Sequence, residues 1–239
     1  MQVTEKITIT NEDNMALMAR YPDNYFDLAI VDPPYGIGFG AFNRTNKATN
    51  GQRVKANKYK NSDWDNSTPN DEYFKELKRI SINQICFGGN YFLQLAGIET
   101  PNLKKKEEFL EYIGKSYSKW LFWHKQNPVP NFADGELAWL SNGLESSIFD
   151  FRYYGNIEGK TSASKKHHPT QKPIELYKYC LEKYALDGFK ILDTHLGSGS
   201  IAIACHDYGF ELTACELDTD YFDSAIKRIK NHVGQTKLF

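Results

Sequence analysis

The amino-acid sequence predicts an α/β fold, with a doubly wound, mostly parallel sheet in a single domain over residues 1–239. Apolar and β-branched runs alternate along the chain with segments whose apolar residues recur at helical spacing. Polar turn residues follow several of these runs, and a glycine-rich loop joins one of them to a helix. Apolar residues make up 41% of the chain, which is enough for one large core. In sheets of this class, ligands bind at the carboxyl ends of the strands.

The N-terminal segment predicts a β-α-β unit. Residues 6–10 alternate and are β-branched, which is typical of a strand. A helix over about 14–20 and a second strand over 26–31 follow. Because parallel strands present their carboxyl ends at one edge of a sheet, we expect Asp13 and Asp32 to lie at the same edge.

Residues 36–70 predict a flexible basic loop within the domain, because the periodicity of the chain stops there. Two interpretations stay open: a solvated surface loop, or an arm that contacts phosphates and orders on nucleic acid. The whole chain carries a net charge of only −1, so the positive charge of this segment is local and favours the second interpretation. The basic residues of the loop are Arg44, Lys47, Arg53, Lys55, Lys58 and Lys60.

The middle of the chain predicts two more strands and three helices. The helices are expected over about 71–83, 90–96 and 103–114, and the strands over 84–87 and 119–124.

Residues 131–167 predict an edge hairpin, formed by 136–140 and 148–154, plus an irregular insertion. The segment is rich in aromatic residues and ends near two basic ones, Lys165 and Lys166. Such residues could stack on bases and hold phosphates, or the aromatic rings could simply pack against the sheet. Both interpretations stay open.

The last third returns to regular alternation. It predicts helices over 173–184, 200–208 and 221–233, with strands over 189–193 and 210–215.

Composition excludes several classes of protein. No apolar run approaches the 18 or so residues of a membrane span, and no signal-peptide pattern opens the chain. The four cysteines have neither disulfide nor Cys-x-x-Cys spacing, and no histidine spacing indicates a metal site. We therefore expect a cytoplasmic protein without a bound metal.

The loop over residues 193–200 predicts a site for a nucleoside-containing cofactor. Gly197, Gly199 and Ala202 satisfy a loose G-x-G-x-x-A pattern between a strand and a helix. Glycines allow the backbone to approach a ligand, and a helix N-terminus offers free N–H groups. Glu216 lies at the end of the next strand, where a carboxylate can bind both hydroxyls of a ribose. A plain tight turn would leave Glu216 unexplained.

The tetrapeptide Asp32-Pro33-Pro34-Tyr35 should be stiff and extended, because each proline fixes its own φ and restricts the preceding residue. Taken alone, it fits a proline turn after a strand as well as it fits an aimed functional group.

Three segments, taken in order, resemble the amino-DNA methyltransferases. They are the tetrapeptide 32–35, His168-Pro169-Thr170-Gln171-Lys172-Pro173, and Asp193-x-x-x-Gly197-x-Gly199. The order resembles the permuted subgroup, in which the catalytic tetrapeptide precedes the methyl-donor loop. The resemblance implies a Rossmann-like methyltransferase fold, with target recognition in residues 131–167, and DNA methylation of the kind found in restriction–modification systems.

The resemblance implies catalytic roles for Asp32, Pro33, Pro34 and Tyr35. The Asp32 carboxylate and the main chain at Pro33 would accept hydrogen bonds from the exocyclic amino group of a flipped base, and the Tyr35 ring would stack on that base. A cysteine nucleophile for methylation of cytosine carbon would need a Pro-Cys context, and none of the four cysteines has one.

The resemblance also implies the residues that bind S-adenosylmethionine. Glu216 would hold the ribose, Asp13 would reach the adenine amino group, and Thr170 and Lys172 would meet the methionine end. The family often has Asp-Pro-Phe where this chain has Asp193-Thr194-His195. The full expected set is Asp13, Asp32, His168, Thr170, Lys172, Asp193, Leu196, Gly197, Ser198, Gly199, Ser200, Glu216 and Leu217.

The expected function is an S-adenosylmethionine-dependent methyltransferase that acts on adenine N6 in double-stranded DNA. Within the family, Asp at the first position of the tetrapeptide favours adenine and Ser favours cytosine. The alternatives are methylation of cytosine N4, of RNA or of a protein amide, a non-catalytic DNA-binding relative, and a nicotinamide enzyme with the same glycine loop. Relatives often dimerise, so a homodimer is a further expectation.

Overall fold

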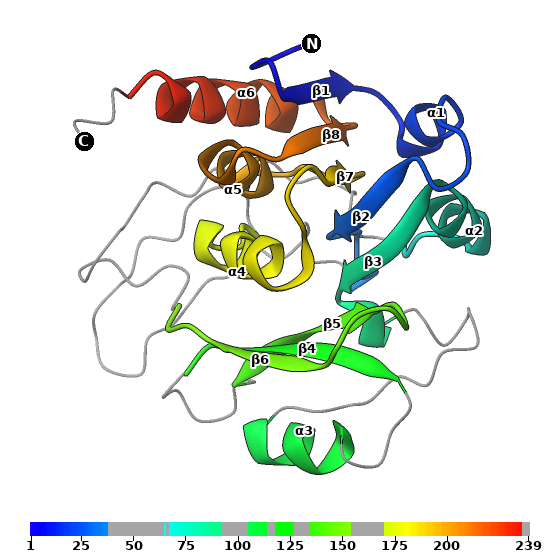
Figure 1. Cartoon of the computed structure of the whole chain (residues 1–239), viewed down its shortest axis with the longest axis vertical. Coiled ribbons are helices and arrows are strands. Elements are labelled where there is room, and N and C mark those ends of the chain that lie inside the picture. Colours follow the sequence, from blue (N-terminus) through cyan, green and yellow to red (C-terminus); the bar gives the residue numbers. More distant parts are fainter. Residues whose placement is uncertain are drawn as a thin grey trace.

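The computed structural model describes residues 1–37, 65, 67–91, 105–113, 118–126, 134–153 and 170–235. Within these residues, eight strands form one sheet in the order β1-β8-β7-β2-β3-β5-β4-β6 (Figure 1). The strands are β1 (Ile7–Asn11), β2 (Phe26–Val31), β3 (Ser81–Phe87), β4 (Lys119–His124), β5 (Gly135–Leu140), β6 (Ser147–Asp150), β7 (Lys190–Asp193) and β8 (Glu211–Glu216).

The first five strands of that order are parallel, so their carboxyl ends lie at one edge. Asn11 at the end of β1 pairs with Glu216 at the end of β8, and Asp193 at the end of β7 pairs with Ala214. β2 pairs in parallel with both β7 and β3. β5 then runs antiparallel to β3 and to β4, and β6 returns parallel to β4 at the far edge.

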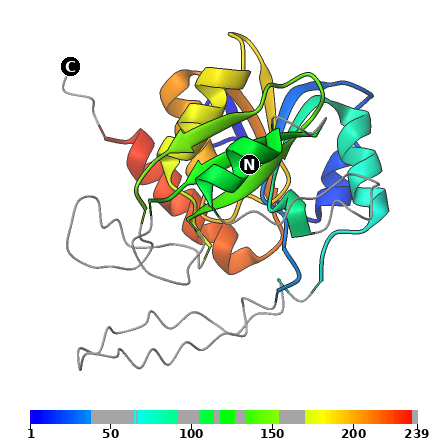
Figure 2. The same cartoon turned by 90° about the horizontal axis from the view of Figure 1, so that it is seen from below.

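Helices cover both faces of the sheet, as the doubly wound fold predicts. They are α1 (Asn14–Met18), α2 (Asp71–Ile80), α3 (Lys106–Ile113), α4 (Ile174–Tyr184), α5 (Ser200–Tyr208) and α6 (Thr219–Val233). The group α4, α5 and α6 lies on the opposite side of the sheet from α1 and α2, which is also visible from below (Figure 2).

Alternation along β2 explains why the sheet has two cores. Leu28 and Ile30 point into the cluster under α4, α5 and α6, whereas Ala29 and Val31 join the cluster under α1 and α2. All four side chains are buried, as expected for a strand in the middle of a parallel sheet.

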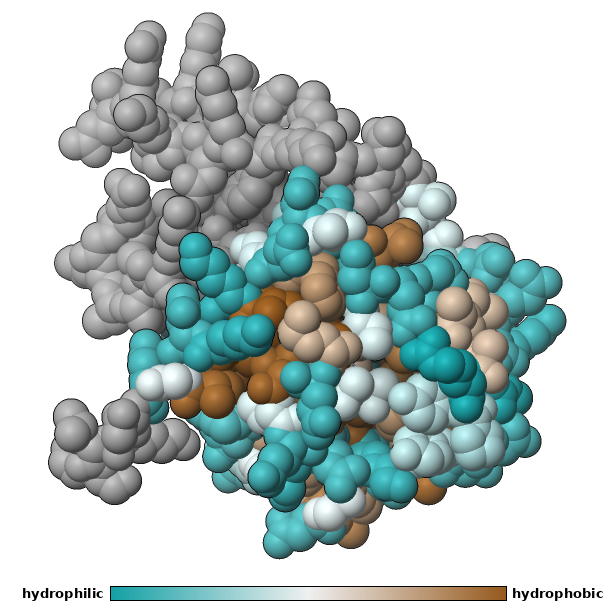
Figure 3. Space-filling view, turned by 90° about the horizontal axis from the view of Figure 1, so that it is seen from above, coloured by the Kyte–Doolittle hydropathy of each residue, from teal (hydrophilic) through white to brown (hydrophobic). Residues whose placement is uncertain are grey.

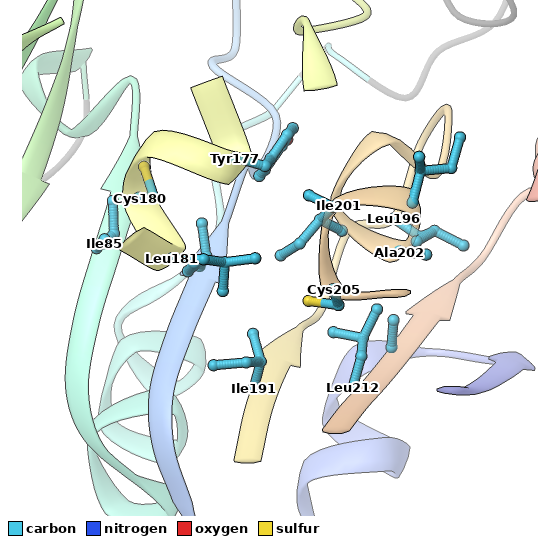
Figure 4. Packing of buried hydrophobic residues seen from close by; sticks show 14 of the residues in the cluster. Ile85, Tyr177, Cys180, Leu181, Ile191, Leu196, Ile201, Ala202, Cys205 and Leu212 are labelled. Atoms are coloured by element: carbon cyan, nitrogen blue, oxygen red, sulfur yellow. The ribbon is translucent and has the colours of Figure 1, made fainter. Parts of the chain in front are cut away.

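Side chains of the larger cluster pack α4 and α5 against the strands. Leu181 of α4 and Cys205 of α5 lie close to Ile191 of β7, and Cys180 of α4 lies beside Ile85 of β3 (Figure 4). A smaller third cluster lies between α3 and the strands β4 and β5. Seen from above, the described surface is mostly hydrophilic, with apolar residues gathered in small patches (Figure 3).

The expected strands 26–31 and 119–124 and the helix 200–208 have the bounds that the sequence predicts. The helix expected over 71–83 ends at Ile80, because Ser81 is extended and begins the pairing of β3 with β2. The helix expected over 103–114 begins at Lys106.

The edge hairpin expected within 131–167 is wrong in its pairing. β5 and β6 are not neighbours, because β4 lies between them and pairs with both. β5 belongs inside the sheet, between β3 and β4: three of its residues pair with β3, six pair with β4, and most of its side chains are buried. Of the helix expected over 90–96, the described part is the end of a short 3-10 turn, Gly89–Tyr91, and the rest lies outside the described residues.

Among the helices that the structure describes, none combines the length and the apolar character needed to cross a bilayer. The four cysteines are buried and free, as the absence of a disulfide pattern predicts.

The buried face of β2 generates a stability prediction. Ile30→Ala should lower the free energy of unfolding by about 2–5 kcal/mol, because it leaves a cavity in the larger cluster. Ile82→Ala in β3 is the matched control: its side chain is 54% exposed, so the change should cost less than about 0.5 kcal/mol. Urea unfolding followed by circular dichroism measures both, and equal losses would contradict the placement of Ile30.

Candidate active site

A pocket of about 570 Å³ lies at the carboxyl edge of β1, β2, β7 and β8. This is the edge at which parallel α/β sheets bind ligands. Ten residues that the sequence predicts for the site line the pocket: Asp13, Asp32, Pro34, Thr170, Lys172, Leu196, Gly197, Ser198, Glu216 and Leu217.

Other expected residues lie beside the pocket or outside the described chain. Asp193 is buried beneath the loop at 1% exposure, and the structure describes Pro33, Tyr35, Gly199 and Ser200 next to lining residues. Outside the described residues lie His168 and the expected nucleic-acid contacts Arg44, Lys47, Arg53, Lys55, Lys58, Lys60, Lys165 and Lys166.

Glu216 fixes the glycine loop from the end of the neighbouring strand. Its carboxylate accepts hydrogen bonds from the backbone N–H of Gly197 (2.8 Å) and of Asp218 (3.0 Å). Burial raises the pKa of Glu216, and the two backbone hydrogen bonds oppose that shift. The carboxylate is therefore held at the mouth of the loop, in the pocket wall.

The glycines of the loop are required by backbone geometry. Gly199 has φ +76° and precedes α5, and a Cβ built there would lie 2.9 Å from Cδ1 of Ile229. Gly197 also has a positive φ of 54°. Glycine adopts such angles without strain and lets α6 pack closely under the loop.

A second set of contacts anchors the loop to the segment before α4. Ser200 Oγ donates to the carbonyl oxygen of Lys172 (2.8 Å). The Arg228 guanidinium donates to the carbonyl of Ser198 (2.8 Å) and to Ser200 Oγ (3.0 Å). The sequence patterns did not identify Arg228, since nothing local marks an arginine thirty residues away as a loop anchor.

Asp193, the last residue of β7, is buried beneath the glycine loop. Burial is the main cause that raises its pKa to about 8, and the backbone N–H of His195, 2.9 Å from Oδ1, acts in the opposite direction. Its place at the end of β7 fits a role in shaping the loop.

His195, where the family often has Phe, belongs to a polar network in the pocket wall. The Asn14 amide lies 3.0 Å from Nε2 of His195, and Thr194 Oγ1 lies 2.9 Å from its Nδ1. Thr194 Oγ1 in turn lies 2.7 Å from the hydroxyl of Tyr73. Burial lowers the pKa of His195 to about 4, so the ring is neutral at pH 7. Sequence reasoning missed Asn14 and Tyr73, although a histidine at the position where the family often has Phe was a signal that polar partners exist.

Asp13 lies in the pocket wall and also caps α1. Its Oδ1 accepts hydrogen bonds from the backbone N–H of Met15 (2.8 Å) and Ala16 (3.2 Å). The other carboxylate oxygen takes no part in these caps.

The tetrapeptide begins directly after β2 and is held by two carboxylates. Asp65, only 2% exposed, accepts hydrogen bonds from the backbone N–H of Tyr35 (2.7 Å) and of Gly36 (3.0 Å). The hydroxyl of Tyr35 donates to Oδ1 of Asp32 (2.8 Å). Lys172 Nζ lies 2.6 Å from the same oxygen. Two donors thus hold the side chain of Asp32 at one carboxylate oxygen.

The Tyr35 ring packs against residues that follow β3. It stacks on Tyr91 with ring centroids 5.1 Å apart and planes at 13°. A Cβ at Gly88, where φ is +68°, would lie 2.1 Å from the ring, so only glycine leaves room for it. Burial and the nearby Asp32 raise the pKa of Tyr35 well above 10, so its hydroxyl stays protonated and can donate.

The residues of the pocket fit S-adenosylmethionine. The positively charged donor would lie between two carboxylates, Glu216 beside the glycine loop and Asp32 at the end of β2, in a space of the size that small cofactors occupy. Glu216 is placed to hold a ribose, and the loop that it fixes lets a ligand approach the backbone closely.

Comparisons with known proteins agree with this geometry. Residues 143–227 match a family model described as DNA methylase. The chain is 23% identical to the type II methyltransferase M2.LlaDCHI of Lactococcus lactis subsp. cremoris, covering 94% of this chain and 90% of that one. It is 22% identical to M2.DpnII of Streptococcus pneumoniae, with the same coverage.

Solved structures share the fold. The complex of M1.HpyAVI with SAM matches with a TM-score of 0.54 at 19% identity, covering 93% of this chain and 99% of that one. PvuII DNA methyltransferase, described as cytosine-N4-specific, matches with a TM-score of 0.54 at 12% identity, covering 97% of this chain and 94% of that one.

The tetrapeptide after β2, the glycine loop with Glu216 and the match of residues 143–227 are the features that this chain shares with the amino-DNA methyltransferases, a family that uses S-adenosylmethionine.

Proposed function

We propose that this protein methylates the exocyclic amino group of a base in double-stranded DNA, at adenine N6. One observation carries the proposal: Asp32, the acceptor of the tetrapeptide, and Glu216, the expected ribose ligand, line the same pocket. The amino group and the methyl donor would therefore meet within it.

An amino nitrogen on a base is a weak nucleophile, because its lone pair is delocalised into the ring. The Asp32 carboxylate and the Pro33 carbonyl are two acceptors that would hold its hydrogens and leave the lone pair directed away from them. S-adenosylmethionine, when bound, would supply an electrophilic methyl group on a sulfonium: the nitrogen–carbon bond would form as the carbon–sulfur bond breaks, S-adenosylhomocysteine would be released, and the surplus proton of the amino group would pass to water. Asp32 needs only to accept hydrogen bonds, so no covalent intermediate with the protein forms.

The base must leave the duplex to reach this pocket, which costs a few kcal/mol. Stacking on the ring of Tyr35 would offset part of that cost. Asp65 already holds the backbone of Tyr35, and the ring packs against Gly88 and Tyr91, so the ring loses little conformational freedom when a base binds.

Contacts with the DNA backbone are the part of the proposal that lies outside the described residues. The basic residues between positions 36 and 62, together with Lys165 and Lys166, would neutralise phosphates. Target recognition by segment 131–167, a homodimer, a cytoplasmic location and a reaction without a metal also stay predictions. β5 and β6, which belong to that segment, serve as strands of the sheet.

We infer adenine because Asp32 is the first residue of the tetrapeptide. Family members that methylate adenine tend to have Asp at this position, whereas those that methylate cytosine tend to have Ser. PvuII DNA methyltransferase, with the same fold, is described as cytosine-N4-specific, so the fold does not decide between the bases.

The experiment that tests the function is methyl transfer from labelled S-adenosylmethionine to unmethylated genomic DNA, followed by digestion to nucleosides and mass spectrometry. We expect label in N6-methyldeoxyadenosine. Label in N4-methyldeoxycytidine would correct the base, and transfer to RNA but not to DNA would overturn the proposed substrate.

Asp32→Ala should abolish methyl transfer, a loss of at least about 100-fold in kcat, while the protein still binds S-adenosylhomocysteine. Asp223→Ala removes an exposed carboxylate from α6 and is the control that should stay active. Rates of methyl transfer measured with saturating donor test this role. Full activity of Asp32→Ala would show that Asp32 is not a catalytic residue.

Glu216→Gln should weaken binding of S-adenosylhomocysteine by about 10–100-fold, because hydrogen bonds to a charged acceptor are worth about 1.5–3 kcal/mol. Glutamine keeps the shape of the side chain and an acceptor for the N–H of Gly197. Isothermal titration measures the affinity, with Glu211→Gln at the exposed start of β8 as the control. Unchanged affinity in both variants would show that Glu216 does not hold the donor.

A further inference from the structure

The side chain of Lys172 contacts the tetrapeptide. Its ammonium lies 2.6 Å from Oδ1 of Asp32 and 3.0 Å from the hydroxyl of Tyr35. The side chain is only 4% exposed, so this ammonium has little water to replace those partners. Its position is thus set by the tetrapeptide.

Both hydrogen-bond donors to the side chain of Asp32 bind the same oxygen. The Tyr35 hydroxyl and Lys172 Nζ both donate to Oδ1. Among the described residues, no donor binds Oδ2, and Asp32 lines the pocket with its side chain 17% exposed. One oxygen of the carboxylate is held, and the other is left for a hydrogen-bond donor that enters the pocket.

We propose that Lys172 is a positioning residue of the methyl-transfer reaction: its ammonium holds Asp32 as a charged acceptor with Oδ2 directed at the amino group of the target base. This inference rests on the proposed function. A buried ammonium compensates the charge of a neighbouring carboxylate and holds that side chain in one rotamer. An acceptor that must point at one group of the substrate needs such a fixed orientation.

The backbone of Lys172 connects this acceptor to the donor loop. Its carbonyl oxygen accepts a hydrogen bond from Ser200 Oγ, at the first residue of the helix after the glycine loop. Arg228 holds the same Ser200 hydroxyl. Lys172 therefore contacts the glycine loop through its main chain and the tetrapeptide through its side chain. A shift of the loop would displace the ammonium from its position beside Asp32.

Further charges explain why a lysine is stable at this depth. Oε2 of Glu136 in β5 lies 3.8 Å from Nζ of Lys172, and Glu136 also pairs with Lys125. The rings of Phe87 and Tyr35 lie 5.0 Å and 5.4 Å from Nζ, within the range of cation–π attraction. The ammonium is thus compensated by two carboxylates and two rings.

The test compares Lys172→Met and Lys172→Arg with wild type, in methyl transfer to DNA and in binding of S-adenosylhomocysteine. For Lys172→Met we expect kcat to fall about 100-fold with donor affinity changed less than about threefold, and for Lys172→Arg we expect partial recovery. Lys178→Met in α4 is the control, because it removes an ammonium paired with Asp207 far from the tetrapeptide and should leave kcat unchanged.

A mutant cycle separates positioning of Asp32 from general loss of structure. In the Asp32→Asn background there is no carboxylate to hold, so adding Lys172→Met should reduce kcat further by less than about threefold. The full 100-fold loss in that background, or weaker donor binding with kcat intact, would overturn the role assigned to Lys172. An inactive wild-type protein would instead refute the proposed function itself.

Discussion

Parallel pairing of β1, β8, β7 and β2 is the constraint on which the site depends. Parallel strands deliver their carboxyl ends to one edge, and the register of Asn11 with Glu216 and of Asp193 with Ala214 aligns those ends to within a residue or two. Three connections that are far apart in the sequence therefore meet there: the turn after β1, the tetrapeptide after β2 and the glycine loop after β7. The pocket is the space between them.

Charge inside the pocket is arranged in two groups with different tasks. Glu216 is bound to backbone N–H groups and shapes the donor loop, whereas Asp32 is bound to side chains, the ammonium of Lys172 and the hydroxyl of Tyr35. Removing one partner of a buried ion pair usually costs more than the pair contributes, because it leaves a buried charge without compensation. Such a pair is explained better by orientation of Asp32 than by stability.

The parts of the site that are local in sequence could be predicted from it. Two prolines after an apolar run, glycines between a strand and a helix, and Glu216 at the end of the next strand are signals carried by neighbouring residues. The parallel order of the sheet followed from the alternation of strands and helices.

Contacts between distant segments could not be predicted in this way. Lys172 and Asp32 are 140 positions apart, and no periodicity indicates that an ammonium near the start of α4 turns toward the end of β2. Asp65 comes from a stretch without regular spacing, yet it holds the backbone of Tyr35. The position of β5 between β3 and β4 depends on the order of strands in the sheet, which residue patterns within each strand do not contain.

A crystal structure of the protein with S-adenosylhomocysteine tests the central claim most directly, namely that one pocket presents the donor to the tetrapeptide. The account predicts that Glu216 binds the ribose hydroxyls, that the sulfur faces Asp32, and that Lys172 Nζ stays on Oδ1 of Asp32. A ligand outside this pocket, or one whose carboxylate has drawn Lys172 away from Asp32, would contradict it.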